Sequence, residues 1–583
     1  MSSRSGRTAI VVVVLALIAF TSGCTTGIRR WVDQGFKVGP EYCPPGAHVA
    51  GQWRDSEAPT VRLDEPELAQ WWAVFNDPVL DNLVVEARRE NIPLKVAGLR
   101  VLEARAQLGF VRGHLWPQQQ QIQGRYSRNQ ISSNAFPFSE FGNVPGFRFN
   151  YDDWSLGAQL AWELDFWGRF RRMIEAAEAN AEAEQEACRA AAVLLAAETA
   201  STYLQLRSAE ERLAFARTNV DLQRKTVKIV QARVDQGVAS MLDLHQAQAI
   251  LATTESMIPM LETLHRVSEN RLSTLMAMPP QDLKAILGGA GVIPQTPPEI
   301  ALGIPANLLR RRPDVRKAER MAAAQCAKIG VAESELYPHI AITGQLGYQA
   351  ESLPDLFTTK SFAGAIGPGF RWDVLNYGRL RNAVLIENVR FRQAVLGYQE
   401  TVLRAAEEAE GAITAYLNEQ VRVKKLGEAT ESVAKAVQLA LLQYEQGLID
   451  FQRVIDSQSG LVRQQDALAE ARGKAATNLV QIFKALGGGW QSPWMLSPRD
   501  TSGIEGVEKL LPPDSAPNEG GLVEPEPAQK NQPASPEHEQ SPPPAPPQPA
   551  APAIQRLPMP EPPATPAVPQ ASQRLTVPEP QSR

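Results

Sequence analysis

The segment from Arg169 to about Asp235 carries a heptad repeat, which most constrains the fold of this chain. A sustained repeat of this kind is typical of the seam of a coiled coil. At 1.5 Å per residue the helix would be on the order of 100 Å long. Because this length exceeds any compact domain core, the sequence predicts an elongated structure. The apolar heptad positions are Leu206, Leu213, Val220, Val227 and Val234.

An internal duplication repeats this long helix later in the chain. "WGRFRR" at Trp167–Arg172 matches "YGRLRN" at Tyr377–Asn382, 210 residues later. "RVDQGVASMLDL" at Arg233–Leu244 matches "QYEQGLIDFQRV" at Gln443–Val454 at the same offset. Upstream the offset becomes 221, so the extra residues fall in the loop around 127–150. A repeat whose length varies at a loop indicates a structural duplication.

Each half is predicted to contain a helix, two strands joined by a loop, a very long helix, a turn and a return helix. In the first half the first four elements are Glu67–Arg112, Pro117–Tyr126, Tyr151–Phe166 and Arg169–Asp235. In the second half they are Ala306–Glu335, Pro338–Tyr348, Phe362–Val374 and Arg379–Gln446. The predicted boundaries are a signal peptide (1–23), an extended linker (24–65), a first repeat (66–280), a connector (281–305), a second repeat (306–488) and a tail (489–583).

The strand before the first long helix, "WSLGAQLAWELDF", alternates between an apolar, aromatic face and a polar face. This pattern is what a transmembrane β-barrel strand needs, and a sandwich strand is the weaker alternative. Four strands are too few to close a barrel, whose smallest bacterial examples have about eight. Three chains would supply about twelve strands and leave no free edge. The predicted lumen-facing residues are Ser155, Gln159, Glu163 and Asp165.

The two ends of the chain carry separate signals. Arg4 and Arg7 precede an apolar run that ends in "TSGC", a pattern typical of an export signal. Cys24 after small residues suggests a lipoprotein signal with Cys24 as the acylated residue, although Thr21 stands where leucine is usual. The alternative is ordinary cleavage nearby. At the other end, Pro512–Arg583 holds 22 of the 45 prolines, which favours a disordered spacer.

Composition argues against several function classes. A net charge of −5 is too small to indicate a nucleic-acid partner, and no cysteine or histidine spacing indicates a metal site or another cofactor. Glu163 and Asp165 could serve acid–base chemistry as a pair. No nucleophile–base pair or phosphate loop accompanies them, so an enzyme is the weaker hypothesis.

Several motifs together resemble the outer-membrane efflux proteins, the TolC-like family, and specifically its NodT-type lipoprotein branch. They are "VGPEYCPP" at Val38–Pro45, "WWAVFNDPVLDNLVVEARREN" at Trp71–Asn91, "LLRRRPDVRKAER" at Leu308–Arg320, "IGVAESELYPHIAITGQLGY" and "WDVLNYGRLRN". The resemblance covers roughly Gly39 to Gly488.

This resemblance implies an α+β membrane protein that forms a homotrimer. Its long coiled-coil helices would form a periplasmic tunnel, and four strands per chain would contribute to a 12-stranded β-barrel in outer-membrane lipid. The trimer would be lipid-anchored and conduct drugs or toxic compounds passively. Its implied partners are a periplasmic adaptor and an inner-membrane transporter of the RND type. The alternative is an elongated periplasmic coiled-coil adaptor or scaffold.

The resemblance also implies a gate at the two helix turns farthest from the strands. By position the constriction residues are Asp243 and Asp456, and Tyr444 occupies a network position. The rest of that network cannot be carried over, because Ile449 stands where some members have an arginine and Arg453 where they have an aspartate. A local version would pair Arg453 with Asp450 or Asp456, in this chain or a neighbouring one. Rings of symmetry-related carboxylates repel one another and suit cation selection. The alternative for Asp243 is that it caps the return helix.

Overall fold

The computed structural model describes Arg29 and residues 31–62, 64, 66–132, 134, 136, 148–303, 305 and 310–491. The chain divides into two units, Met1–Pro512 and Pro513–Arg583, and every described residue belongs to the first. The predicted signal peptide, Cys24 and the tail beyond Gln491 lie outside the described residues.

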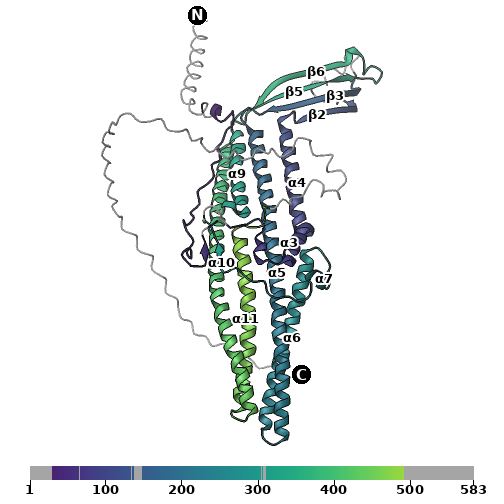
Figure 1. Cartoon of the computed structure of the whole chain (residues 1–583). Coiled ribbons are helices and arrows are strands. Elements are labelled where there is room, and N and C mark those ends of the chain that lie inside the picture. The colour runs from purple at the N-terminus through teal and green to yellow at the C-terminus, as the bar shows by residue number, and fades with distance from the viewer. Residues whose placement is uncertain are drawn as a thin grey trace, which may run out of the picture. The chain divides into compact units, whose positions relative to one another are not determined.

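Two long helical hairpins and one antiparallel sheet make up the first unit (Figure 1). The hairpins are α5 (Arg169–Asp235) with α6 (Met241–Leu275), and α10 (Arg379–Glu445) with α11 (Phe451–Ala485). The predicted bounds of both long helices are confirmed, with only the C-terminus of α10 one residue shorter. Each begins after a glycine in the left-handed region, Gly168 at φ 80° and Gly378 at φ 83°. Equivalent residues of the two repeats therefore start equivalent helices.

The opening helix of the first repeat is shorter than predicted. The sequence predicts one helix over Glu67–Arg112, whereas the structure has η1 (Trp71–Phe75), α3 (Pro78–Glu90) and α4 (Ile92–Arg112). Asn76 is left-handed at φ 48°, and the Asp77 side chain accepts a hydrogen bond from Val79 N at 2.9 Å. Asn91 ends α3 and caps α4 by accepting from Leu94 N at 3.0 Å. Capping residues followed by proline thus divide an otherwise helical pattern.

In the second repeat the opening helix, α9, covers Pro313–Ser334 and packs against α5 and α10. The connector between the repeats holds the short helix α7 (Lys284–Leu287) and the strand β4 (Ile300–Ala301). β4 pairs in parallel with β1 (Val61–Arg62) of the N-terminal segment. The 3₁₀ turns η2 (Gly113–Leu115) and η4 (Thr359–Ser361) precede strands.

The main sheet has the order β2-β3-β5-β6, with every neighbouring pair antiparallel. Its strands are β2 (Gln119–Gln130), β3 (Asn150–Leu164), β5 (His339–Ala350) and β6 (Phe362–Arg371). The register places Trp162 opposite Ile342 and Leu156 opposite Tyr348, while Gln159 lies opposite Gln345. Residues directly opposite share a face, so the predicted apolar face continues across the strands. The sheet lies at the end of the helices opposite the hairpin turns (Figure 1).

No helix within the described ranges combines the length and apolar composition that a membrane span requires.

The largest apolar core lies where η1, α3, α5, α6, α10 and α11 come together. Trp71 is 2% exposed and its ring stacks on Phe483 at 5.3 Å between centroids. The buried Arg312 guanidinium joins the start of α9 to the end of α11 by donating to the Ala485 carbonyl oxygen at 2.5 Å. It also forms ion pairs with Asp314 at 2.8 Å and Glu408 at 2.9 Å. The "RRPDV" motif is therefore a structural clamp between helices.

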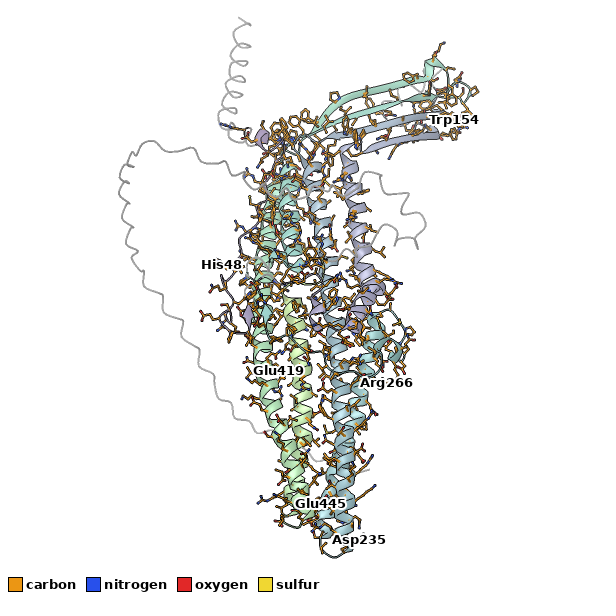
Figure 2. The ribbon with its side chains drawn as sticks, in the orientation of Figure 1. His48, Trp154, Asp235, Arg266, Glu419 and Glu445 are labelled. Atoms are coloured by element: carbon orange, nitrogen blue, oxygen red, sulfur yellow. The ribbon has the colours of Figure 1, made fainter. Side chains whose placement is uncertain are left out.

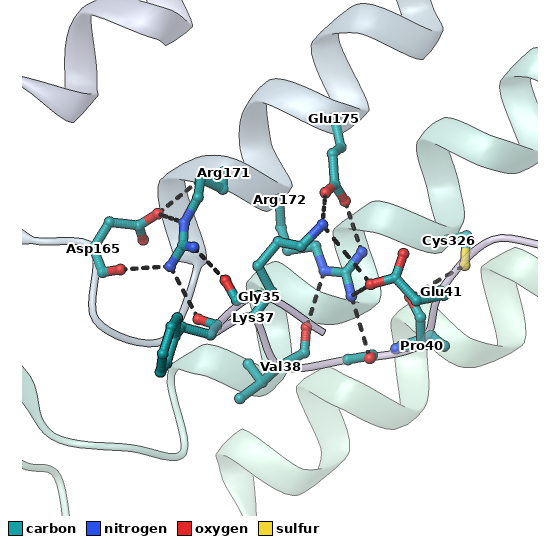
Figure 3. A network of polar contacts seen from close by, with 12 residues as sticks. Gly35, Lys37, Val38, Pro40, Glu41, Asp165, Arg171, Arg172, Glu175 and Cys326 are labelled. Carbon is teal, nitrogen blue, oxygen red and sulfur yellow. Dashed lines mark hydrogen bonds and ion pairs between the residues drawn. The ribbon is translucent and has the colours of Figure 1, made fainter. Parts of the chain in front are cut away.

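A polar network holds the N-terminal segment against the start of α5 (Figure 3). The Arg172 side chain, 2% exposed, donates from Nε to the Val38 carbonyl oxygen at 3.0 Å and pairs with Glu175 at 2.7 Å and Glu41 at 2.9 Å. Gly39 has φ 89°, and a Cβ there would lie 2.4 Å from Cα of Gly330 on α9. The "VGPEY" motif therefore reflects a backbone approach that only glycine permits.

Candidate functional site

Both hairpin turns adopt the same helix-ending motif. The Gly237 and Val238 N–H groups donate to the Val234 and Arg233 carbonyl oxygens, at 2.8 and 2.9 Å. In the second hairpin Gly447 and Leu448 donate in the same way to Tyr444 and Gln443, both at 2.9 Å. The two glycines have φ 73° and 75°, as this Schellman arrangement requires. Figure 2 places the helix ends Asp235 and Glu445 far from Trp154 in the sheet.

Asp243 has a structural role at the first turn. The N-cap of α6 is Ser240, whose Oγ accepts from Asp243 N at 3.2 Å. The Asp243 carboxylate accepts in return from Ser240 N at 3.2 Å, which completes a capping box. The structure thus shows that Asp243 takes part in capping the return helix, as the alternative proposed. It does so as the N3 residue of the capping box and not as the N-cap. This role leaves its carboxylate half-buried at the turn.

The acidic and basic residues of the second turn are exposed. Asp450 is the N-cap of α11 without a side-chain capping bond, and Asp456 accepts from Gln452 Nε2 at 2.9 Å. Arg453 forms no ion pair with any residue in the described part of this chain. Within this chain Arg453 is thus not paired with Asp450 or Asp456, and all three side chains are exposed. Pairing with a neighbouring chain stays a prediction.

Tyr444 connects the two hairpins through a residue that sequence reasoning missed, Arg233. The Arg233 guanidinium lies over the Tyr444 ring, 4.6 Å from its centroid, and Nη1 donates to the Tyr444 carbonyl oxygen at 2.6 Å. The Tyr444 ring also packs against Phe451, with 5.2 Å between the ring centroids. Only a comparison of the two repeats could have drawn attention to Arg233. At the equivalent position the second repeat has an uncharged residue, Gln443.

The Tyr444 hydroxyl and the Arg233 Nε are buried polar atoms without a hydrogen-bond partner among the described residues. Burial raises the pKa of the Tyr444 hydroxyl; Arg233 opposes this shift and Asp243 adds to it. An apolar cluster shared by the two hairpins surrounds the pair. Its buried members are Val230, Leu244, Ala247, Ala440, Tyr444, Phe451 and Val454.

The predicted lumen residues of the sheet occupy two different settings. Gln159 lies on β3 and accepts from Gln123 Nε2 of β2 at 3.1 Å. Glu163 lies near the end of β3, where it contacts Arg169 Nη1 at 3.1 Å and His339 Nδ1 at 2.8 Å.

The prediction that Asp165 is a strand residue facing the lumen is wrong, because β3 ends at Leu164. Its carboxylate accepts from the backbone N–H of Phe170 at 2.9 Å and of Arg171 at 3.0 Å. It also accepts from the Arg171 Nε at 2.9 Å. Asp165 therefore holds the start of α5, where a carboxylate is favoured by the helix dipole.

Among the described residues, no group of three or more histidine, cysteine, aspartate or glutamate side chains could hold a metal ion. The polar residues of the turns and of the sheet can attract or repel ions.

Comparison with known proteins identifies the architecture. The family described as "Outer membrane efflux protein" matches residues 83–277 and 304–488, which follow the two repeats. The chain belongs to this outer membrane efflux protein family. It is therefore an efflux channel protein of the outer membrane, and the family match decides against the periplasmic adaptor alternative.

Individual relatives agree with the family match. The chain is 28% identical to Nodulation protein T of Rhizobium leguminosarum bv. viciae, over 80% of this chain and 93% of that protein. It is 27% identical to the "Probable outer membrane lipoprotein SilC" of Salmonella typhimurium, over 78% and 95% of the two chains. The solved structure of the outer-membrane channel OprN superposes with a TM-score of 0.72 at 31% identity, covering 78% of this chain and 100% of that one.

Proposed function

We propose that this outer membrane efflux protein works as a homotrimer whose twelve strands close one β-barrel in outer-membrane lipid. The observation that carries the proposal is the open sheet. Among the described strands, β2 pairs only with β3, and β6 only with β5. Unpaired edges beside an apolar face are unfavourable in lipid, because backbone groups there need hydrogen-bond partners. Three copies related by symmetry satisfy both edges of every sheet.

Light scattering and bilayer recordings on the detergent-purified chain test this proposal. We expect the mass of three chains and discrete conductance steps in planar lipid bilayers. A monomer that stays soluble without detergent and gives no conductance would contradict it.

We also propose that Cys24 carries the lipid anchor. The described segment after it lies beside the connection from β3 to α5: the Trp31 ring is 5.2 Å from Phe166 and 5.4 Å from Trp167. Tryptophan is favoured at membrane interfaces, so this segment starts near the membrane surface. The name of the relative SilC supports the same anchoring. Metabolic labelling with a palmitate analogue tests it, with Cys24→Ser as the negative control.

The hairpin turns are proposed as the gate and as the docking surface for a periplasmic adaptor. Val238 and Leu448 occupy equivalent positions at the two turns and are 62% and 69% exposed. Paired apolar tips fit an adaptor that contacts both hairpins. Crosslinking from these positions in cells tests adaptor docking, and crosslinks confined to the sheet would contradict it. The inner-membrane partner is proposed to be a transporter of the RND type.

Within this gate, Asp243 and Asp456 are proposed as the constriction, and Tyr444, Asp450 and Arg453 as its contacts between hairpins or chains. Gln159 and Glu163 are proposed to line the barrel. Conduction would be passive, because the energy for efflux would come from the partner transporter, and drugs or toxic compounds are the proposed cargo.

A further inference from the structure

Equivalent side chains of the two repeats make the same contact where each strand pair meets the helices. In the first repeat the Trp162 Nε1 donates to the Leu115 carbonyl oxygen at 3.2 Å. In the second repeat the Trp372 Nε1 donates to the Leu336 carbonyl oxygen at 3.0 Å. The two tryptophans are 210 residues apart and the two leucines 221, which are the two offsets of the duplication. Individual contacts at this end of the sheet therefore follow the duplication.

One aromatic contact at this end of the sheet joins the first repeat to the second. Trp167, between β3 and α5, stacks on Tyr337, just before β5, with 4.6 Å between the ring centroids and 23° between the planes. The Trp167 Nε1 also donates to the Pro338 carbonyl oxygen at 2.9 Å. β3 and β5 are the strands through which the two repeats pair in the sheet. The Trp167–Tyr337 pair therefore marks a joint between successive repeats.

The counterparts of these two residues lie at the two edges of the sheet. The duplication maps Trp167 to Tyr377, which follows β6, and Tyr337 to Trp116, which precedes β2. β6 and β2 are the outer strands of the sheet (Figure 1). Tyr377 is 97% exposed and Trp116 is 71% exposed. Neither ring contacts another aromatic ring in the part of the chain that the structure describes. Two large aromatic side chains are thus left without the contact that their counterparts make.

Tyr377 and Trp116 of one chain cannot form this contact with each other. β3 and β5 lie between their strands, so β2 and β6 are separated by three strand spacings, or about 14 Å. Aromatic pairs have centroids about 4.5–7 Å apart. The ring that completes each joint must therefore come from a second copy of the chain.

We propose that Tyr377 of each copy stacks on Trp116 of the partner subunit, as Trp167 stacks on Tyr337 within one chain. The inference rests on the trimer of the proposed function, and it names the side chains that fasten the seam where β6 of one copy meets β2 of the next. Both joints then consist of one tryptophan and one tyrosine in exchanged order. The contact also supports the left-handed backbone of Tyr377, whose φ of 50° is unfavourable for a bulky residue.

Cysteine crosslinking of the full-length protein in outer membranes tests this contact. The variant carries Trp116→Cys and Tyr377→Cys together with Cys43→Ser, which removes an exposed native thiol. We expect a short bifunctional thiol reagent to give dimers and trimers on denaturing gels. Each single-cysteine variant should give monomers, which controls for the remaining native thiols. Ile122→Cys with Tyr377→Cys is the matched control and should also stay monomeric, because Ile122 is six residues further along the chain, about 20 Å at the rise of a strand.

Ring substitutions test whether the contact stabilises the assembly. Trp116→Ala and Tyr377→Ala should each speed trimer dissociation in warm detergent about tenfold, because three symmetry-related ring pairs are lost. The double alanine variant should dissociate no faster than the single variants, since all of them remove the same contact. The exchanged variant, Trp116→Tyr with Tyr377→Trp, should restore the parent rate. Equal dissociation of the exchanged and double alanine variants overturns the proposal.

Light scattering and bilayer conductance of the same variants separate this inference from the proposed function. A conducting trimer whose cysteines at positions 116 and 377 do not crosslink between chains overturns the ring contact and leaves the proposed function intact. A crosslink formed within one chain also overturns the contact. A monomeric protein without conductance overturns both.

Discussion

The guanidinium group of Arg233, at the end of α5, lies 4.6 Å from the ring centroid of Tyr444, at the end of α10. Its Nη1 also donates to the Tyr444 carbonyl oxygen at 2.6 Å, so one side chain holds both the ring and the backbone of the second hairpin. This contact ties together the tips of two helical hairpins that belong to different repeats. Its rupture would free one hairpin tip from the other.

We expect Arg233→Ala to raise single-channel conductance and to destabilise the protein by about 1–2 kcal/mol. The estimate combines a partly buried cation–π contact with one charge-assisted hydrogen bond. Bilayer recordings and urea unfolding measure the two effects. Arg224→Ala is the matched control, because Arg224 lies on the same helix in an exposed ion pair with Glu255. Equal conductance in the two variants would show that Arg233 does not contribute to the gate.

Replacing Asp456 by asparagine should lower cation selectivity without a large change in stability, because its carboxylate is exposed and proposed to face the pore axis. Reversal potentials in a salt gradient measure the effect. Glu431→Gln, which removes an exposed carboxylate on α10 away from the turn, should leave selectivity unchanged. If the two variants had the same cation selectivity, the Asp456 charge would not contribute to ion selection.

The two roles of Asp243 can be separated by comparing two substitutions. Asparagine keeps an oxygen that can accept from Ser240 N but removes the charge, whereas alanine removes both. We expect Asp243→Asn to alter selectivity alone, and Asp243→Ala also to cost about 1 kcal/mol of stability. Selectivity that changes only in the alanine variant would identify Asp243 as a capping residue without a direct role in the pore.

Gly39→Ala should loosen the N-terminal segment from α9. The added Cβ would lie 2.4 Å from Cα of Gly330, and φ 89° is unfavourable for alanine. We expect faster proteolysis within residues 37–45 and a loss of about 1 kcal/mol or more in unfolding free energy. Gly46→Ala is the control, since a Cβ there meets no atom within 4 Å. Identical digestion of the two variants would contradict the close approach.

Acid should weaken the clamp between α9, α10 and α11. Burial alone would raise the pKa of Glu408, but hydrogen bonds from Lys484 and Arg312 outweigh it and hold that pKa below its usual value of 4.5. The unfolded chain therefore binds the proton more readily, so stability is present above pH 4.5 and falls as the pH drops through the lowered folded pKa.

Glu408→Gln should be less stable than the parent at pH 7 and should lose less stability between roughly pH 5 and pH 3. Urea midpoints across this range measure the difference. Glu407→Gln, at an exposed neighbouring position, should retain the acid sensitivity of the parent. If Glu408→Gln lost as much stability as the parent over this pH range, the Glu408 carboxyl would not contribute to the acid sensitivity.

The long helices, the duplication and the two faces of the sheet could be predicted from local patterns in the sequence. Heptads and strand alternation are local patterns, so the bounds of α5 were found from the sequence and the shared face of Trp162 and Ile342 was expected. The same patterns overextended the opening helix, because the break depends on the left-handed Asn76 and the capping side chains of Asp77 and Asn91.

The side-chain contacts at the hairpin tips and at the start of α5 depend on how the elements pack, and they could not be predicted from the sequence. Arg233 and Tyr444 are far apart in sequence and meet because two hairpins pack through an apolar cluster. Asp165 occupies the next polar position of the strand pattern, yet its carboxylate accepts from backbone N–H groups at the start of α5, because β3 ends one residue earlier. Periodicity fixes which face a residue occupies within its own element. The partner across a packing interface depends on how whole elements dock, and that information is not local.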